Sequence, residues 1–130
     1  MGDAEKLVGH WRLAEWSGRT ASGECVRHGG DQPSGDLIYL ESGHMAVQIQ
    51  FDVERSEQPP SDTYLAYCGR WEIREPGTIV HCVELALHPD NVGIEKVRPY
   101  ALEGDQLVLE TQPLDTGEGL ASSVIRWRRI

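Results

Sequence analysis

The chain has 130 residues, a mass of 14.5 kDa and 39% hydrophobic residues, which fits one globular domain spanning residues 1–130. Its 12 Lys and Arg against 21 Asp and Glu give a net charge of −9, so nucleic acid and anionic membrane surfaces are not expected partners. No apolar run approaches the roughly 20 residues of a membrane-spanning helix, and the N-terminus lacks the features of a signal peptide, which favours a cytoplasmic protein.

Short segments of the chain alternate apolar and polar residues with a period of two, and Gly, Pro, Asn and Asp interrupt them. Apart from a short helical start at residues 3–8, no window repeats apolar residues with helical spacing. The pattern predicts an all-β chain with eight strands, near residues 9–17, 36–41, 44–51, 63–74, 78–87, 94–103, 106–111 and 122–129.

Three tight turns, at residues 41–43, 75–77 and 103–106, predict which residues share a face, because loop length fixes the register of a hairpin. The expected cross-strand pairs are Tyr39 with Met45, Leu37 with Val47, Ile73 with Ile79, Trp71 with His81, Gly69 with Val83, Tyr67 with Leu85, Leu102 with Leu107, Tyr100 with Leu109 and Arg98 with Thr111. One apolar face continues through all three hairpins. A closed barrel buries such a face and removes open sheet edges, so we favour a barrel over a sandwich.

Three connections are long and polar, at residues 18–34, 52–62 and 112–122. Loops of this length in a compact domain are more often functional than structural. We expect them to cover one end of the barrel.

Several sequence fragments together resemble the microbial lipocalin-like domain family, in an order and spacing that span nearly the whole chain. The fragments are Leu7-Val8-Gly9-His10-Trp11-Arg12-Leu13, Gly35-Asp36-Leu37-Ile38-Tyr39, Gly43-His44-Met45-Ala46, Tyr67-Cys68-Gly69-Arg70-Trp71, Val80-His81-Cys82-Val83-Glu84, Arg98-Pro99-Tyr100 and Trp127-Arg128-Arg129. The resemblance implies a single antiparallel up-and-down lipocalin-like β-barrel of eight or nine strands with a central cavity. It also implies a barrel floor in which Trp11 packs against Arg126 or Arg128. Some members of the family occur among genes for secondary metabolism.

Arg98 is the most informative candidate site residue, because an inward guanidinium loses water and needs an accepting partner. In one interpretation an internal carboxylate or backbone carbonyls pair with it. In the other it binds a carboxylate, enolate or phenolate of a ligand through two hydrogen bonds.

His81 is the histidine placed inside by the hairpin register, either as a hydrogen-bonded core residue or as a proton-transfer group. Tyr39, Tyr67 and Tyr100 share its face, so their hydroxyls are candidates to meet a ligand or to pack as core aromatics. Trp71 is a candidate stacking platform for a planar ligand. Met45 and Thr111 complete the expected ligand-binding set.

Glu84 points outward by strict alternation, but a β-bulge could turn it inward. The candidate catalytic set is therefore His81, Tyr67 and Glu84. The odd count of three cysteines has no C-x-x-C pair, the histidines form no ligand cluster, and no nucleotide-binding or zinc-protease motif is present. We expect no metal and no cofactor.

Three functions remain open from the sequence. The leading hypothesis is a barrel that binds a small, largely apolar molecule of aromatic, polyketide or terpenoid type, with Arg98 and the tyrosines at its polar end. The alternative is a cofactor-free isomerase or cyclase acting on a secondary-metabolite intermediate. The third is a protein-interaction barrel with a filled core. The sequence does not decide between a monomer and a homodimer.

Overall fold

The computed structural model describes residues 3–20, 25–27, 32–52, 64–111 and 120–130. Its elements are α1 (Asp3–Leu7), β1 (Gly9–Thr20), β2 (Cys25–Arg27), β3 (Ser34–Tyr39), β4 (His44–Gln50), β5 (Tyr64–Glu75), β6 (Thr78–Ala86), the 3-10 helix η1 (Pro89–Asn91), β7 (Glu95–Glu103), β8 (Gln106–Thr111) and β9 (Leu120–Arg129). No helix in these ranges is long and apolar enough to cross a membrane.

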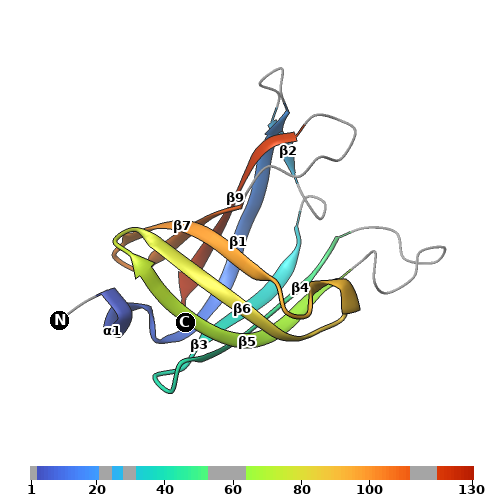
Figure 1. The fold of residues 1–130 in the computed structure, drawn as a ribbon. Helices are drawn as coiled ribbons and strands as arrows, with labels where there is room; N and C mark the ends of the chain where they lie inside the picture. Colours follow the sequence, from blue (N-terminus) through green and yellow to red (C-terminus); the bar gives the residue numbers. More distant parts are fainter. Residues whose placement is uncertain (1–2, 21–24, 28–31, 53–63, 112–119) are drawn as a thin grey trace.

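The strands form one antiparallel sheet in which β3 to β9 follow each other in chain order and β9 pairs back onto β1. β1 and β3 to β9 therefore close an eight-stranded barrel, and β2 forms a short ribbon with the far end of β1 (Figure 1). This confirms the predicted all-β barrel. β2 was not predicted, and β1 is longer than predicted because it continues into this ribbon.

The predicted hairpin register is confirmed over most of its length, with Tyr39 opposite Met45, Trp71 opposite His81 and Tyr100 opposite Leu109. The predicted pair of Tyr67 with Leu85 is wrong. Gly69 pairs with Val83 but Cys68 pairs with Leu85, so Glu84 is an extra residue on β6, and Tyr67 pairs with Ala86. A β-bulge of this kind shifts every later pair by one residue.

The barrel interior is mainly apolar, as alternation along each strand requires. Buried positions come from every strand of the barrel except β7, whose inward residues are half-buried: Trp11, Leu13, Trp16, Leu37, Tyr39, Met45, Val47, Ile49, Tyr67, Ile79, Val83, Leu107, Leu109, Ile125 and Trp127. His81 and Ser123 are the buried polar residues of the described part.

The helix α1 lies against one end of the barrel, close to the C-terminus (Figure 1). Leu7 of α1 is fully buried, and its carbonyl accepts a hydrogen bond of 3.0 Å from the Trp11 indole. The guanidinium of Arg129 lies 4.1 Å from the centre of the Trp11 ring. The expected partners Arg126 and Arg128 are exposed instead, because they alternate with the inward-facing Trp127.

Candidate functional site

The polar centre of the barrel is His81, whose two ring nitrogens are both hydrogen-bonded to tyrosine hydroxyls. Tyr39 Oη lies 2.6 Å from His81 Nε2, and Tyr67 Oη lies 2.7 Å from His81 Nδ1. The three residues come from β3, β5 and β6, and their side chains are buried. The register that pairs Trp71 with His81 therefore brings together three of the predicted site residues.

Burial keeps this triad uncharged. It lowers the pKa of His81 to about 3, and the positive charges of Arg98 and Lys96 act in the same direction. Burial raises the pKa of Tyr67 to about 12, while the charge of Arg98 and a hydrogen bond from it oppose that rise. Desolvation also raises the pKa of Tyr39 well above its usual range. The imidazole is thus neutral and both phenols are protonated near pH 7.

Two cationic side chains of β7 face the same interior. Lys96 pairs with His81 and Arg98 pairs with the fully buried Ile79, and side chains of directly paired residues share a face of the sheet. Lys96 Nζ lies 5.4 Å from the centre of the Tyr67 ring, and burial, followed by the charge of Arg98, lowers the pKa of this lysine. Both side chains are half-buried.

Arg98 has no carboxylate partner among the described residues, whose ion pairs involve other arginines and His10. Its Nη1 donates a 3.3 Å hydrogen bond to the neighbouring Val97 carbonyl. It also acts on the Tyr67 hydroxyl. The described residues therefore offer no acid that could neutralise Arg98, as the first interpretation requires.

The sequence reasoning missed Lys96. The signal was present, because Lys96 lies two residues before Arg98 on one strand, and residues two apart share a face. Alternation that places Arg98 inside also places Lys96 inside.

Other predicted site residues lie around this centre in different settings. The Trp71 ring packs on Tyr39 with 4.7 Å between ring centres, and its indole N–H donates a 2.9 Å hydrogen bond to the Leu40 carbonyl. Met45 is buried beside Tyr39 on the next strand. Tyr100 donates a 2.7 Å hydrogen bond to Asp3 of α1, so its hydroxyl is directed to the helix and not to His81.

Thr111 belongs to a second polar cluster, on β1, β8 and β9. Its hydroxyl is hydrogen-bonded to that of the buried Ser123, and the Trp16 indole donates to the same Ser123 oxygen over 3.4 Å. The predicted pairing of Thr111 with Arg98 is not formed, because the described ladder between β7 and β8 begins at Tyr100 and Leu109. On the other side of β8, Thr111 pairs with Ser123 of β9.

Glu84 lies outside this centre. The bulge that could have turned it inward is present, but Glu84 remains exposed on the outer surface. The bulge turns Leu85 outward as well, with 67% of its surface exposed.

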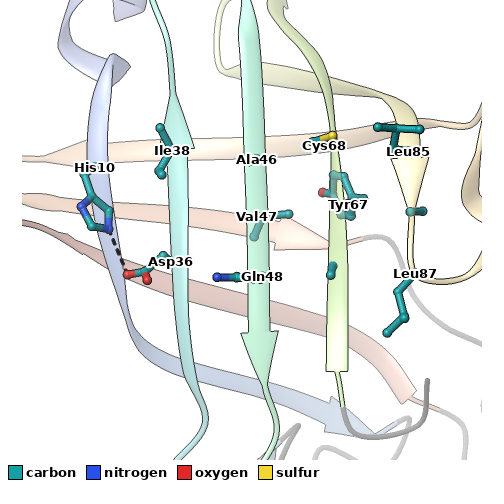
Figure 2. Close-up of a pocket in the computed structure, with 12 residues that line it drawn as sticks. His10, Asp36, Ile38, Ala46, Val47, Gln48, Tyr67, Cys68, Leu85 and Leu87 are labelled. Atoms are coloured by element: carbon teal, nitrogen blue, oxygen red, sulfur yellow. Dashed lines mark hydrogen bonds and ion pairs between the residues drawn. The ribbon is translucent and has the colours of Figure 1, made fainter. Parts of the chain in front are cut away.

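A hollow of about 480 Å³ lies on the outer wall of the barrel, across β1 and β3 to β6 (Figure 2). Small outward residues, Ala46, Ala66 and Cys68, form its floor between the larger Ile38 and Leu85. His10 and Asp36 lie on its edge, joined by a 3.0 Å contact. Its floor residues alternate along their strands with inward ones such as Val47 and Tyr67, so the sheet separates the hollow from His81.

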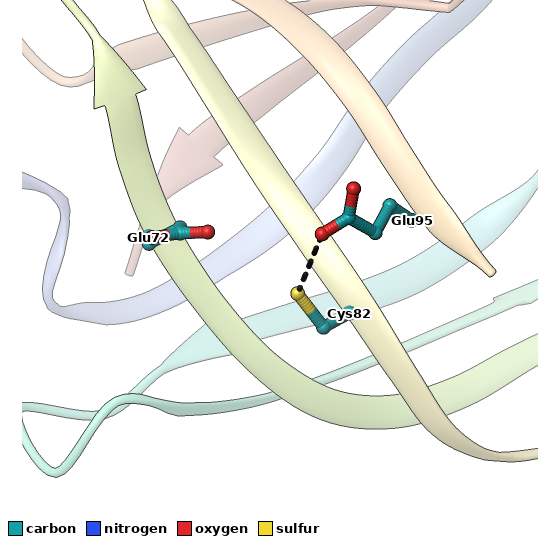
Figure 3. A group of neighbouring side chains, drawn as sticks. All are labelled: Glu72, Cys82 and Glu95. Atoms are coloured by element: carbon teal, nitrogen blue, oxygen red, sulfur yellow. Dashed lines mark hydrogen bonds between the residues drawn. The ribbon is translucent and has the colours of Figure 1, made fainter. Parts of the chain in front are cut away.

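Glu72, Cys82 and Glu95 also meet on the outer wall (Figure 3). Such a group could hold a cation, but the Arg74 guanidinium already binds both carboxylates, at 2.7 Å from Glu72 and 2.7 Å from Glu95. Arg74 holds the pKa of Glu95 below its usual range. The cluster is thus an ion-pair network of the sheet surface.

A closed antiparallel barrel with a few polar groups set in an apolar interior is the architecture of barrels that bind small molecules. A family model described as a lipocalin-like domain matches residues 8–130, and the chain belongs to this lipocalin-like family. The crystal structure of Rv2717c from M. tuberculosis is similar to the chain at 13% sequence identity and a TM-score of 0.44, covering 100% of this chain and 99% of that one. No curated protein matches the sequence.

Proposed function

We propose that the barrel binds a small, largely apolar molecule in its interior, of aromatic, polyketide or terpenoid type. The observation that carries this proposal is the set of polar groups His81, Tyr67, Lys96 and Arg98 within an apolar wall. Sites of this kind use apolar surface for affinity and a few placed polar groups for orientation.

A neutral dye tests the proposal without testing the charge of the ligand. N-phenyl-1-naphthylamine is apolar, and its fluorescence rises when it leaves water. Two neighbouring residues of β5 distinguish interior from exterior binding, because Leu65 packs against the core while Ala66 lines the outer hollow.

We expect the dye to bind the wild-type protein, Leu65→Trp to reduce binding by filling the interior, and Ala66→Trp to leave it unchanged. Loss of binding only in Ala66→Trp would assign the dye to the outer hollow and contradict the proposal. Absence of dye binding to the wild type would also contradict it.

The alternative of a cofactor-free isomerase or cyclase has less support. A general base works best with a pKa near the working pH, whereas burial lowers the pKa of His81 to about 3. Both ring nitrogens are also already engaged by Tyr39 and Tyr67. The third hypothesis, an interaction barrel, would use the outer hollow in place of the interior.

A further inference from the structure

The Tyr39–His81–Tyr67 triad contains one more proton than its own hydrogen bonds use. Two neutral phenols and one neutral imidazole carry three O–H and N–H protons, while the triad has two internal hydrogen bonds. One hydroxyl, at one end of the triad, therefore has a hydrogen left to donate elsewhere.

The surroundings of the two tyrosines decide which hydroxyl has the spare hydrogen. Tyr39 is fully buried, and within the described part of the chain its hydroxyl has no other hydrogen-bond partner than His81. A spare hydrogen there would be a buried donor without an acceptor, which is unfavourable. Tyr39 is therefore the donor to Nε2, His81 carries its proton on Nδ1, and Nδ1–H donates to Tyr67.

The spare hydrogen then belongs to Tyr67. The oxygen of Tyr67 receives the Nδ1–H of His81, and the positive charge of Arg98 acts on the same hydroxyl, so its own hydrogen points to a further acceptor. Lys96 lies over the same ring. Two cationic side chains thus lie near the Tyr67 phenol, and no carboxylate among the described residues pairs with Lys96 or Arg98.

We infer that the interior holds an oxyanion, such as the carboxylate of an otherwise apolar ligand, bound by the Tyr67 hydroxyl, Lys96 and Arg98. Tyr39 and His81 are positioning residues that fix the direction in which Tyr67 donates. This inference rests on the proposed function and specifies the chemical class of the ligand.

Matched acids and amides test the charge preference. The probes are 2-naphthoic acid with 2-naphthamide and decanoic acid with decanamide, with affinities measured by calorimetry near pH 7.5. Each pair shares its apolar part, so the difference reports on the polar end. We expect at least one acid to bind more tightly than its amide, by at least about 10-fold.

Variants then assign the preference to two of these donors, Tyr67 and Lys96. Tyr67→Phe should weaken binding of the acid probe by about 10- to 100-fold, the usual effect of losing a hydrogen bond to a charged group. Binding of the amide probe should stay nearly unchanged. Lys96→Met should act in the same way. The controls are Tyr100→Phe, which removes a hydroxyl bonded to α1, and Arg70→Met, which removes an exposed charge from the outer side of β5.

The proton position on His81 can be measured directly by ¹⁵N NMR of the imidazole in the full-length protein. We expect Nδ1 to give the signal of a protonated nitrogen and Nε2 that of an unprotonated acceptor. A merely structural histidine would not require this tautomer. The opposite tautomer would overturn the role assigned to Tyr39 and His81.

The outcomes separate the inference from the proposed function. Equal binding of acids and amides would overturn the oxyanion site while leaving a neutral-ligand barrel. An acid preference that Tyr67→Phe and Lys96→Met do not reduce would also overturn it. Failure of all four probes and of the neutral dye would overturn both.

Discussion

Among the described residues, no negatively charged group faces His81 inside the barrel. The groups facing it are the phenols Tyr39 and Tyr67 and the cations Lys96 and Arg98. Its charged form is therefore disfavoured by desolvation and by two like charges, and its neutral form is stabilised by both tyrosines. The same arrangement makes the folded state sensitive to acid.

The first prediction concerns this acid sensitivity. The pKa of His81 is about 3 in the folded protein against 6.5 for an ordinary histidine, so below pH 6.5 the unfolded chain binds a proton that the folded chain does not. Titration of His81 should lower the free energy of unfolding by about 1.4 kcal/mol for each pH unit below 6.5. The total loss should reach about 2 to 3 kcal/mol near pH 4.5. Urea denaturation across this range measures it.

The variant His81→Gln should remove this part of the pH dependence, because glutamine does not titrate. His44→Gln removes an exposed imidazole from β4 and should keep the wild-type behaviour. A pH dependence equal in wild type and His81→Gln would show that His81 is solvated and titrates normally.

The second prediction separates the two interpretations of Arg98. Within the described chain no carboxylate would be stranded by Arg98→Met, so stability should stay within about 1 kcal/mol of wild type or rise, since an uncompensated half-buried cation is a cost to the empty barrel. Binding of the acid probes should weaken by about 2 to 5 kcal/mol.

Thermal melts with and without the acid probe test Arg98→Met. Strong destabilisation combined with normal probe binding would return Arg98 to a purely structural role. The exposed Arg70→Met is the matched control, and it should change neither quantity.

At the scale of the strands, the β6 bulge sets the outer and inner faces near the site. Glu84 is the extra residue, and the β5 residue at this point is Gly69. An added Cβ on Gly69 would lie 1.9 Å from the Cys82 carbonyl oxygen. The close approach of the two backbones thus requires glycine at this position.

The third prediction follows from this contact. Gly69→Ala forces the backbones of β5 and β6 apart and should cost about 1 to 3 kcal/mol of stability, as for other overpacked interiors. Ala46→Ser adds one atom on the exposed face of β4 and should change stability by less than about 0.5 kcal/mol. Equal stability of Gly69→Ala and wild type in urea would show that the bulge relaxes freely.

The elements also show how far the sequence could predict this fold. Turn lengths and alternation placed Trp71 opposite His81 and Tyr39 beside Met45, because tight turns leave little freedom of register. The same information could not place Tyr67 opposite Ala86. A bulge inserts one residue without a distinctive local motif, and Gly69 was the sole sign of the close approach.

The candidate site was predictable in part for a different reason. Alternation identifies which residues face inward, such as His81 and Arg98, but it does not say which of them meet across the barrel. The contacts of Tyr39 and Tyr67 with His81 depend on three strands and on the curvature of the sheet. Tyr100 faces the same side, yet it reaches Asp3 of α1, whose position over the barrel end no strand pattern specifies.

For the whole molecule, one end of the barrel brings the segment around α1 together with the last residues of β9. β9 pairs with β1, and the Ile130 backbone N–H donates a 3.0 Å hydrogen bond to the His10 carbonyl. Arg129 donates to the carbonyls of Lys6 in α1 and of Val8 directly after it. Trp11 lies in the middle of these contacts, so closure of the barrel and docking of α1 depend on the same side chain.

The fourth prediction is that Trp11→Ala lowers the free energy of unfolding by about 3 to 5 kcal/mol, the usual cost of emptying a buried aromatic site. Trp11 is fully buried, and its removal also takes away the hydrogen bond to the Leu7 carbonyl and the ring on which the Arg129 guanidinium lies. Arg12→Ala, an exposed neighbour paired with Asp36, should cost less than about 1 kcal/mol. Because His81 and its tyrosines lie on other strands, the folded fraction of Trp11→Ala should still bind the neutral dye. An unchanged urea midpoint would show that barrel closure does not depend on Trp11.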